Sequence, residues 1–281
     1  MLLSKLELKA WLEEDLGQGD LTTEALIDPN LQVRSFILAK EAGCCFGLKL
    51  CSEILRELGA TVKVIHTTED GQDFEKGQKI LELEVNYSAM LKAERLSLNL
   101  LQRLCGIATM AKHYQSAVAH TRAKILDTRK TTPGLRRLEK AAVLAGGAYN
   151  HRFGLYDQFL IKENHMAAFR NEHNPFACAI NKAREFAKKP VIIEVENLSE
   201  VELSLEAKPE VILLDNMSLE EMKQSVQLCE EKSPVTECEA SGGITRDTLI
   251  DVAETGVHRI SVGAITHSAP NLDLSMLMEV I

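Results

Sequence analysis

Residues 191–216 read VIIEVENLSEVELSLEAKPEVILLDN. The stretch holds two short apolar runs, 191–195 and 211–214, separated by a polar segment with helical spacing at 199–207. A strand, a helix and a second strand in this order form a βαβ unit, whose two strands lie parallel. The stretch therefore predicts a parallel sheet with helices packed on it.

The same alternation extends over residues 123–262. Ser199 with Glu202, and Ser218 with Glu221, have the spacing of capping boxes at two helix starts. The pattern fits a β/α barrel and also an open doubly wound sheet, but no G-x-G-x-x-G motif favours the open sheet, so we infer a barrel. We expect strands at 123–127, 158–162, 191–195, 211–214, 235–240 and 258–262, and helices at 134–147, 167–188, 199–207, 218–231 and 245–255.

Residues 1 to about 120 mix helix and strand signals instead. Ser4 and Glu7 have capping-box spacing, and Gly17 and Gly19 end the helix that follows. Short β-prone runs separated by glycines are typical of strands. We expect strands at 33–39, 61–66 and 79–85, and further helices at 47–58 and 88–105.

The composition is that of a globular protein. The 281 residues carry 32 basic and 41 acidic side chains, a net charge of −9, and 45% are apolar. This negative balance argues against a general nucleic-acid or anionic-membrane binder, and no apolar run reaches the ~20 residues of a membrane span. The charged N-terminus does not read as a secretory signal, and the seven cysteines lack C-x-x-C spacing. We therefore expect reduced thiols and a cytoplasmic protein.

Cations gather in one part of this acidic chain. Guanidinium groups pair with carboxylates and phosphates through two hydrogen bonds, whereas lysine acts as a point charge. The cluster suggests a ligand with several negative groups, and a salt-bridge network with nearby acids is the alternative. Its members are Arg129, Lys130, Arg137, Lys140, Arg152 and Lys162.

Carboxylates follow the expected strands. Glu194 and Glu196 share one side of their strand, Asp215 ends the next, and Glu237 and Glu239 share a side of a third. Such acids could pair with a lysine, coordinate a metal together with a phosphate ligand, or hold sugar hydroxyls. Spacing alone does not rank them.

Two glycine turns follow the last two expected strands. They read Ser-Gly-Gly-Ile-Thr at 241–245 and Ser-Val-Gly-Ala at 261–264. Glycine lets backbone N–H groups approach a phosphate, and the last strands of a barrel often end at a phosphate site. A tight turn is the plain alternative for each, but two in succession favour phosphate binding. The histidines lack zinc-ligand spacing, and no nucleophile motif indicates covalent acyl chemistry.

Several motifs, in order along the chain, resemble those of quinolinate phosphoribosyltransferase, also called nicotinate-nucleotide pyrophosphorylase (carboxylating). The likeness runs from end to end, although Ala148 stands where the family often has a third glycine. The motifs are EDLGQGDLTT (14–23), ERLSLNLL (94–101), CGIA (105–108), LDTRKTTPGLR (126–136), GGAYNHRFGL (146–155), LIKENH (160–165), EVEN (194–197), LDN (214–216), EASGGI (239–244) and ISVGA (260–264).

The resemblance implies an α/β fold: an irregular, incomplete α/β barrel with a smaller N-terminal α/β sandwich domain. We expect the sandwich domain at residues 1–115, with a C-terminal helix at about 270–281 packed on it, and the barrel at 116–269. A homodimer, with or without higher assembly, is also implied. Arg95, which its helical position alone marks only as solvated, is then expected to reach the neighbouring subunit's active site.

The implied reaction transfers a phosphoribosyl group from 5-phosphoribosyl-1-pyrophosphate (PRPP) to quinolinate with decarboxylation. Its products are nicotinate mononucleotide, pyrophosphate and CO2, a step of de novo NAD biosynthesis. Magnesium is expected to bind through PRPP, with no protein-only metal site and no organic cofactor. Catalytic roles fall to Lys162, Glu194 and Asp215, and substrate binding also to Arg95, Thr128, Arg129, Lys130, His151, Arg152, Ser241, Gly242, Gly243, Val262, Gly263 and Ala264.

By the same resemblance, Arg129, Arg152, Lys162 and the neighbourhood of His151 surround the two carboxylates of quinolinate. Lys130, Glu194 and Asp215 hold PRPP and its magnesium, and family position favours Glu194 over Glu196. Two other functions stay open: a transferase that acts on nicotinate, which has one carboxylate, and a binding protein that keeps a phosphate pocket without catalysis. A substrate panel separates the first, and tight PRPP binding without pyrophosphate release would indicate the second.

Overall fold

The computed structural model describes residues 4–281. Contacts between Cα atoms divide the chain into two compact units. Of the described residues, the first unit comprises 4–112, 132–147 and 268–281, and the second comprises 113–131 and 148–267. Residues 132–147 thus group with the first unit, and the expected division at residues 115 and 116 stays a prediction.

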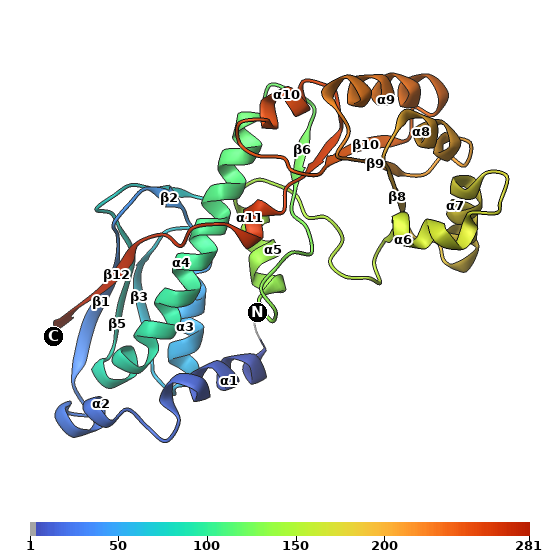
Figure 1. The fold of residues 1–281 in the computed structure, drawn as a ribbon. Helices are drawn as coiled ribbons and strands as arrows, with labels where there is room; N and C mark the ends of the chain where they lie inside the picture. The colour runs from blue at the N-terminus through green and yellow to red at the C-terminus, as the bar shows by residue number, and fades with distance from the viewer. Residues whose placement is uncertain (1–3) are drawn as a thin grey trace. The chain divides into compact units, whose positions relative to one another are not determined.

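A four-stranded antiparallel sheet forms the first unit, in the order β12-β1-β5-β3 (Figure 1). Its inner strands are β1 (Gln32–Ala39) and β5 (Lys79–Asn86), and its outer strands are β3 (Lys63–Thr67) and β12 (Leu274–Val280). Apolar residues of the inner strands alternate toward the core, which confirms the expected strands at 33–39 and 79–85. The strand expected at 61–66 is present but begins two residues later, and it is exposed throughout.

The helices of this unit are α1 (Lys5–Leu16), α2 (Leu21–Leu26), α3 (Leu48–Glu57), α5 (Arg136–Ala145) and most of α4 (Tyr87–Ala117), and a short pair joins β2 (Gly43–Cys44) to β4 (Asp73–Phe74). The Ser4 capping box and the end of α1 at Gly17 are confirmed. Helix α4 continues beyond the expected end at residue 105, because Ala108, Ala111 and Tyr114 extend its buried stripe.

The prediction of a C-terminal helix at 270–281 was wrong. Residues 274–280 form β12, which pairs with β1 in antiparallel register. Leu272, Leu274 and Met276 are buried at every second position, which is the period of a strand and not of a helix. The segment does join the first unit, as an edge strand of its sheet.

The second unit holds a six-stranded parallel sheet in the order β6-β11-β10-β9-β8-β7. Strands β6 and β7 lie at opposite edges, so the sheet is open, in agreement with an incomplete barrel. Its central strands are apolar on both faces, as expected of a parallel sheet covered by helices. The bounds are β6 (Lys124–Leu126), β7 (Phe159–Ile161), β8 (Val191–Val195), β9 (Val211–Asp215), β10 (Glu237–Ser241) and β11 (Arg259–Ser261).

The helices of the second unit depart from the predicted bounds in several places, and the one expected at 245–255 covers only Leu249–Ala253. The helix expected at 167–188 is broken, because Asn174 caps a new start whose first residue is Pro175. The capping box at Ser199 is absent, since Asn197 caps that helix instead, whereas the Ser218 box is confirmed. The elements are α6 (Glu163–Met166), η1 (Ala167–Phe169), α7 (Pro175–Phe186), α8 (Leu198–Leu205), α9 (Leu219–Lys232), α10 (Leu249–Ala253) and α11 (Ala264–His267).

Over residues 4–281, no helix combines the length and apolarity that a membrane span requires.

Candidate active site

A cavity of about 690 Å³ opens at the carboxyl ends of the second unit's strands. In α/β barrels this end of the sheet carries the active site. Every predicted site residue except Arg95 lines the cavity. The additional lining residues are Leu160, Leu213, Asn216, Ile244, Thr245, Ser261 and His267.

Four cations reach this cavity: Arg129 and Lys130 follow β6, Arg152 lies in the loop before β7, and Lys162 follows β7. Arg152 is only 8% exposed. Burial, followed by the positive charge of Arg129, lowers the pKa of Arg152. An anion bound between the two guanidinium groups would relieve both effects, so the cavity favours a negatively charged ligand.

The other two members of the sequence cluster lie elsewhere. Arg137 and Lys140 belong to α5 in the first unit, where Arg137 is 3.9 Å from Glu7 and Lys140 is buried. Neither lines the cavity. Their nearness in sequence to Arg129 was therefore not a sign of a shared site.

Lys162 and Glu194 form an ion pair at the cavity wall. Glu194 is the fourth residue of β8, and strand register sets it opposite Leu213 of β9. Glu196 is exposed, does not line the cavity, and bonds through its backbone to Glu200. Lys162 thus forms a salt bridge with a nearby acid, as the alternative to ligand binding predicted, and it also faces the cavity.

Asp215, Asn216 and the first glycine turn meet where β9 and β10 end. Asp215 pairs in register with Ser241, and Asn216 donates its Nδ2 proton to Asp215 Oδ2 at 2.8 Å. Gly242 has a φ of +98°, and a Cβ there would lie 2.2 Å from Asn216 Oδ1. Only glycine fits this turn, which leaves its backbone accessible to a ligand.

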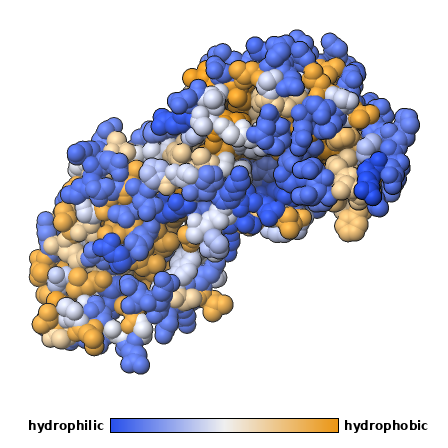
Figure 2. Space-filling view, viewed as in Figure 1, coloured by the Kyte–Doolittle hydropathy of each residue, from blue (hydrophilic) through white to orange (hydrophobic). Residues whose placement is uncertain are grey.

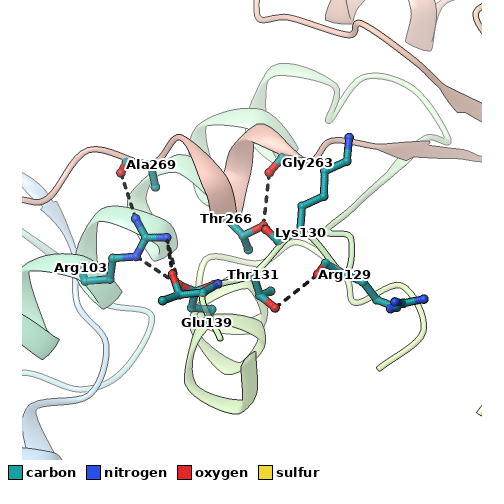
Figure 3. Close-up of polar contacts among 9 residues, drawn as sticks. Arg103, Arg129, Lys130, Thr131, Glu139, Gly263, Thr266 and Ala269 are labelled. Atoms are coloured by element: carbon teal, nitrogen blue, oxygen red, sulfur yellow. Dashed lines mark hydrogen bonds and ion pairs between the residues drawn. The ribbon is translucent and has the colours of Figure 1, made fainter. Parts of the chain in front are cut away.

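A hydroxyl holds the second glycine turn against the segment that carries the cations. Thr266 Oγ1 lies 2.8 Å from the Lys130 carbonyl oxygen and 3.2 Å from that of Gly263 (Figure 3). A Cβ at Gly263 would lie 3.1 Å from Lys130 Cδ and 3.2 Å from His267 Cδ2. The glycine therefore lets the lysine stem cross the turn.

A separate buried ion pair lies in the first unit. Glu139, which is 0% exposed, accepts hydrogen bonds from Arg103 Nε at 3.1 Å and Nη2 at 2.9 Å (Figure 3). Its second oxygen accepts the Thr132 N–H at 3.1 Å. These contacts join α4 to α5 and, through Glu139, to the backbone of Thr132 in the turn that precedes α5. Arg103 therefore stabilises the first unit.

The irregular segment after residue 150 is held by side-chain acceptors. His151 N–H donates to Asp127 Oδ1 at 2.8 Å, and Arg152 N–H donates to His151 Nδ1 at 2.7 Å. Asp157 accepts the next two backbone N–H groups, those of Phe153 and Gly154, at 2.6 and 3.0 Å. Although burial opposes its ionisation, these two N–H groups lower the pKa of Asp157.

Glu239 lies in the middle of β10, fully buried and outside the cavity lining. His151 Nε2 is 3.3 Å from its Oε1, the Ser261 hydroxyl donates to the same oxygen, and Arg259 Nε is 2.8 Å from its Oε2. Burial alone would raise the pKa of Glu239, but the hydrogen bond from His151 and the charge of Arg259 outweigh it and lower that pKa.

The residues around the cavity suit a magnesium ion that arrives with its phosphate ligand. Among the described residues, no group of three or more His, Cys, Asp or Glu side chains could hold a metal by itself. Glu194 and Asp215 nevertheless offer carboxylate oxygens at the cavity wall. Mg²⁺ commonly takes one or two carboxylates and completes its shell with phosphate oxygens and water.

Arg95 lies apart from these groups. It is exposed on α4, in the first unit, and does not line the cavity. Its role stays a prediction.

Sequence reasoning missed several lining residues and supports. Asn216 and Ser261 fall inside quoted motifs, so their positions carried a signal. Glu239 begins a quoted motif, but no local pattern links it to His151, and Thr266 carried little signal because 136 residues separate it from Lys130.

Comparison with known proteins identifies the family. The N-terminal domain profile of quinolinate phosphoribosyl transferase matches residues 20–105, and the C-terminal domain profile matches residues 107–277. The chain is 42% identical over 281 residues to the "probable nicotinate-nucleotide pyrophosphorylase [carboxylating]" of Bacillus subtilis, covering 98% of this chain and 94% of that one. It is 37% identical to the Mycobacterium leprae nicotinate-nucleotide pyrophosphorylase [carboxylating], covering 94% and 93%.

Two solved structures match over nearly the whole chain. The nicotinate-nucleotide pyrophosphorylase of Francisella tularensis superposes with a TM-score of 0.90 at 33% identity, covering 99% of this chain and 98% of that one. NadC of Streptococcus pyogenes gives 0.91 at 37% identity, covering 99% of each. With both domain profiles matched and the fold shared end to end, the chain belongs to the quinolinate phosphoribosyltransferase family.

Proposed function

We propose that the cavity of the second unit is where quinolinate and PRPP react. The activity is that of a nicotinate-nucleotide pyrophosphorylase (carboxylating), a pentosyltransferase of de novo NAD biosynthesis. One observation carries the assignment of the site: a chain with a net charge of −9 brings four cations to a single cavity with two carboxylates. Such a cavity suits two substrates that both carry several negative charges.

Quinolinate is held by the cations at one side of the cavity. Arg129 and Arg152 each offer a planar fork of N–H donors that matches a carboxylate. Lys162 adds a point charge, and the two guanidinium groups lie close enough to lower the pKa of Arg152. The diacid gains more from this set than nicotinate, whose single carboxylate leaves one of the two guanidinium groups unmatched.

PRPP is held across the ends of the next strands. Lys130 and Thr128 face its phosphates, and the turns at 241–243 and 262–264 offer backbone N–H groups. Glu194 and Asp215 lie at the cavity wall, where they would face the ribose and would hold the magnesium that accompanies PRPP. When bound, that ion offsets negative charge on the pyrophosphate.

The chemistry needs orientation and electrostatics more than covalent help from the protein. The pyridine nitrogen donates its electron pair to the anomeric carbon as the bond to pyrophosphate breaks, and pyrophosphate leaves with that bond's electrons. Positive charge develops on the ribose in this step, and the carboxylates of Glu194 and Asp215 stabilise it.

Decarboxylation follows on the product of that step. The carboxylate beside the now cationic ring nitrogen leaves as CO2, its bonding electrons stay on the ring carbon, and a solvent proton takes its place. The cationic ring is the electron sink, so Lys162 and the arginines orient the substrate and perform no covalent step.

We further propose a homodimer in which Arg95 completes the neighbouring active site, with higher assembly open. Large apolar side chains are exposed in the first unit at α2 and β12, and Figure 2 shows apolar surface in this region. Cytoplasmic location is part of the same proposal, supported by seven cysteines that are all free thiols.

Substitution of Lys162 tests the site directly. Lys162→Ala should lower kcat/KM with quinolinate and PRPP by about 10³-fold, because it removes a charge that orients quinolinate for the reaction. Lys223→Ala, which removes an exposed lysine of α9, is the matched control and should leave kcat/KM unchanged. Circular dichroism checks that both variants are folded, and near-normal turnover of Lys162→Ala would rule out its role.

A further inference from the structure

A buried carboxylate lies one layer behind the cavity and takes no part in the proposed reaction. Glu239 is 0% exposed and has three partners: His151, Ser261 and Arg259. Of these, His151 and Ser261 line the cavity. Burying a carboxylate is costly, so its retention in mid-strand calls for a physical reason.

The contacts of His151 define which ring nitrogen carries the proton. Its Nδ1 accepts the Arg152 N–H at 2.7 Å, so Nδ1 holds no proton. Its Nε2 faces Glu239 Oε1 at 3.3 Å, and an ionised carboxylate can only accept a hydrogen bond. For the neutral ring these two contacts select the Nε2–H tautomer, with both nitrogens committed to the protein.

This tautomer orients a substrate-facing arginine. Arg152 N–H needs an acceptor, because it lies in a buried segment outside any helix or strand. His151 Nδ1 is that acceptor only while the proton stays on Nε2, and Glu239 holds it there. The line of contacts thus runs from β10 through His151 to the backbone of Arg152.

We propose that Glu239 is a positioning residue for quinolinate: it fixes the His151 tautomer and thereby sets Arg152 at the cavity. This rests on the proposed function, in which Arg152 grips a substrate carboxylate. Glu239 itself touches no substrate.

Neutralising Arg259 is the competing reason for a carboxylate at this position. Glu237 already serves it, since its Oε2 lies 3.7 Å from Arg259 Nη1. Glu237 shares β10 with Glu239 but does not line the cavity. The two acids therefore form a matched pair that separates the effect on His151 from the effect on Arg259.

Glu239→Gln tests the proposal. The amide group places a donor against either Arg259 Nε or His151 Nε2–H, and the second arrangement drives the ring proton to Nδ1, against the Arg152 N–H. We expect the KM for quinolinate to rise about tenfold, the loss of one hydrogen bond to a charged group, while the KM for PRPP stays within about twofold. Glu237→Gln should leave both KM values within about twofold of the wild type.

The result that overturns the proposal is an unchanged quinolinate KM in Glu239→Gln, or an equal rise in both KM values. If the wild-type protein does not turn over quinolinate at all, the proposed function fails instead, so the two failures are distinct.

A second measurement needs no variant. Nitrogen-15 NMR of histidine-labelled wild-type protein at neutral pH should show His151 as the Nε2–H tautomer, with the resonance assigned by its absence in His151→Gln. A proton on Nδ1 contradicts the proposal, whether or not Glu239→Gln folds.

Discussion

Glu239 links local electrostatics to stability at the scale of single residues. The His151 hydrogen bond and the Arg259 charge lower its pKa in the folded state despite burial. The unfolded chain therefore takes up a proton at Glu239 before the folded chain does as the pH falls. The carboxylate therefore contributes fully to the free energy of unfolding at a pH above the usual pKa of glutamate. This contribution is lost as the pH falls through the lowered pKa of the folded state.

A pH series should reveal this linkage. At pH 7, Glu239→Gln should unfold with a free energy about 2 kcal/mol below that of the wild type, the cost of a lost hydrogen bond to a charged group. The difference in unfolding free energy between the two proteins should narrow below about pH 4. At such pH the unfolded wild-type chain binds a proton at Glu239, so the folded carboxylate contributes less to stability. Urea unfolding at each pH measures it, and a gap that widens with acid would refute the assignment.

The motif residues that line the cavity were predictable from the sequence, but the side chains that hold them in place were not. Thr128, Arg129 and Lys130 line the cavity because they follow a strand, and parallel strands end at one edge. Thr266 and Glu239 hold partners that no local pattern connects to them. The sequence thus indicates what faces the cavity better than what lies behind it.

At the scale of elements, helix-capping residues and the periodicity of apolar residues decided which boundaries were predictable. Strand β8 was predicted to the residue, because its apolar run ends sharply in charged residues. The helix expected from 167 begins at 175, since Asn174 and Pro175 form a stronger start than the periodicity around them. β12 was assigned to a helix although its buried residues recur at every second position.

The Asn174 cap carries a prediction of its own. Its Oδ1 accepts the Ala177 N–H at 3.0 Å, and its Nδ2 donates to the Leu203 carbonyl oxygen at 2.9 Å. Asn174→Ala loses both the cap and the tie to α8, so the free energy of unfolding should fall by about 2 kcal/mol. Asn171→Ala, at an exposed position nearby, should change it by less than about 0.5 kcal/mol. Urea denaturation compares them, and equal stabilities would contradict the cap's importance.

At the scale of the whole molecule, the proposed dimer assigns Arg95 and Lys162 to one active site from two chains. Arg95 is exposed and does not line the cavity of its own chain. Arg95→Ala and Lys162→Ala should each be inactive alone, and a refolded mixture should regain about a quarter of wild-type activity, because half the dimers are mixed and each contains one intact site. Steady-state assays of the mixture test this. Activity no higher than that of the separate variants would contradict a shared site.

The central claim is that a cation-lined cavity in an acidic chain joins a diacid to an activated sugar. The most direct measurement incubates the wild-type protein with PRPP and either quinolinate or nicotinate, and follows CO2, pyrophosphate and mononucleotide together. With quinolinate, we predict equimolar release of all three, and a kcat/KM at least about 10²-fold above that for nicotinate. Pyrophosphate release without CO2, or nicotinate turned over as well as quinolinate, would contradict the account.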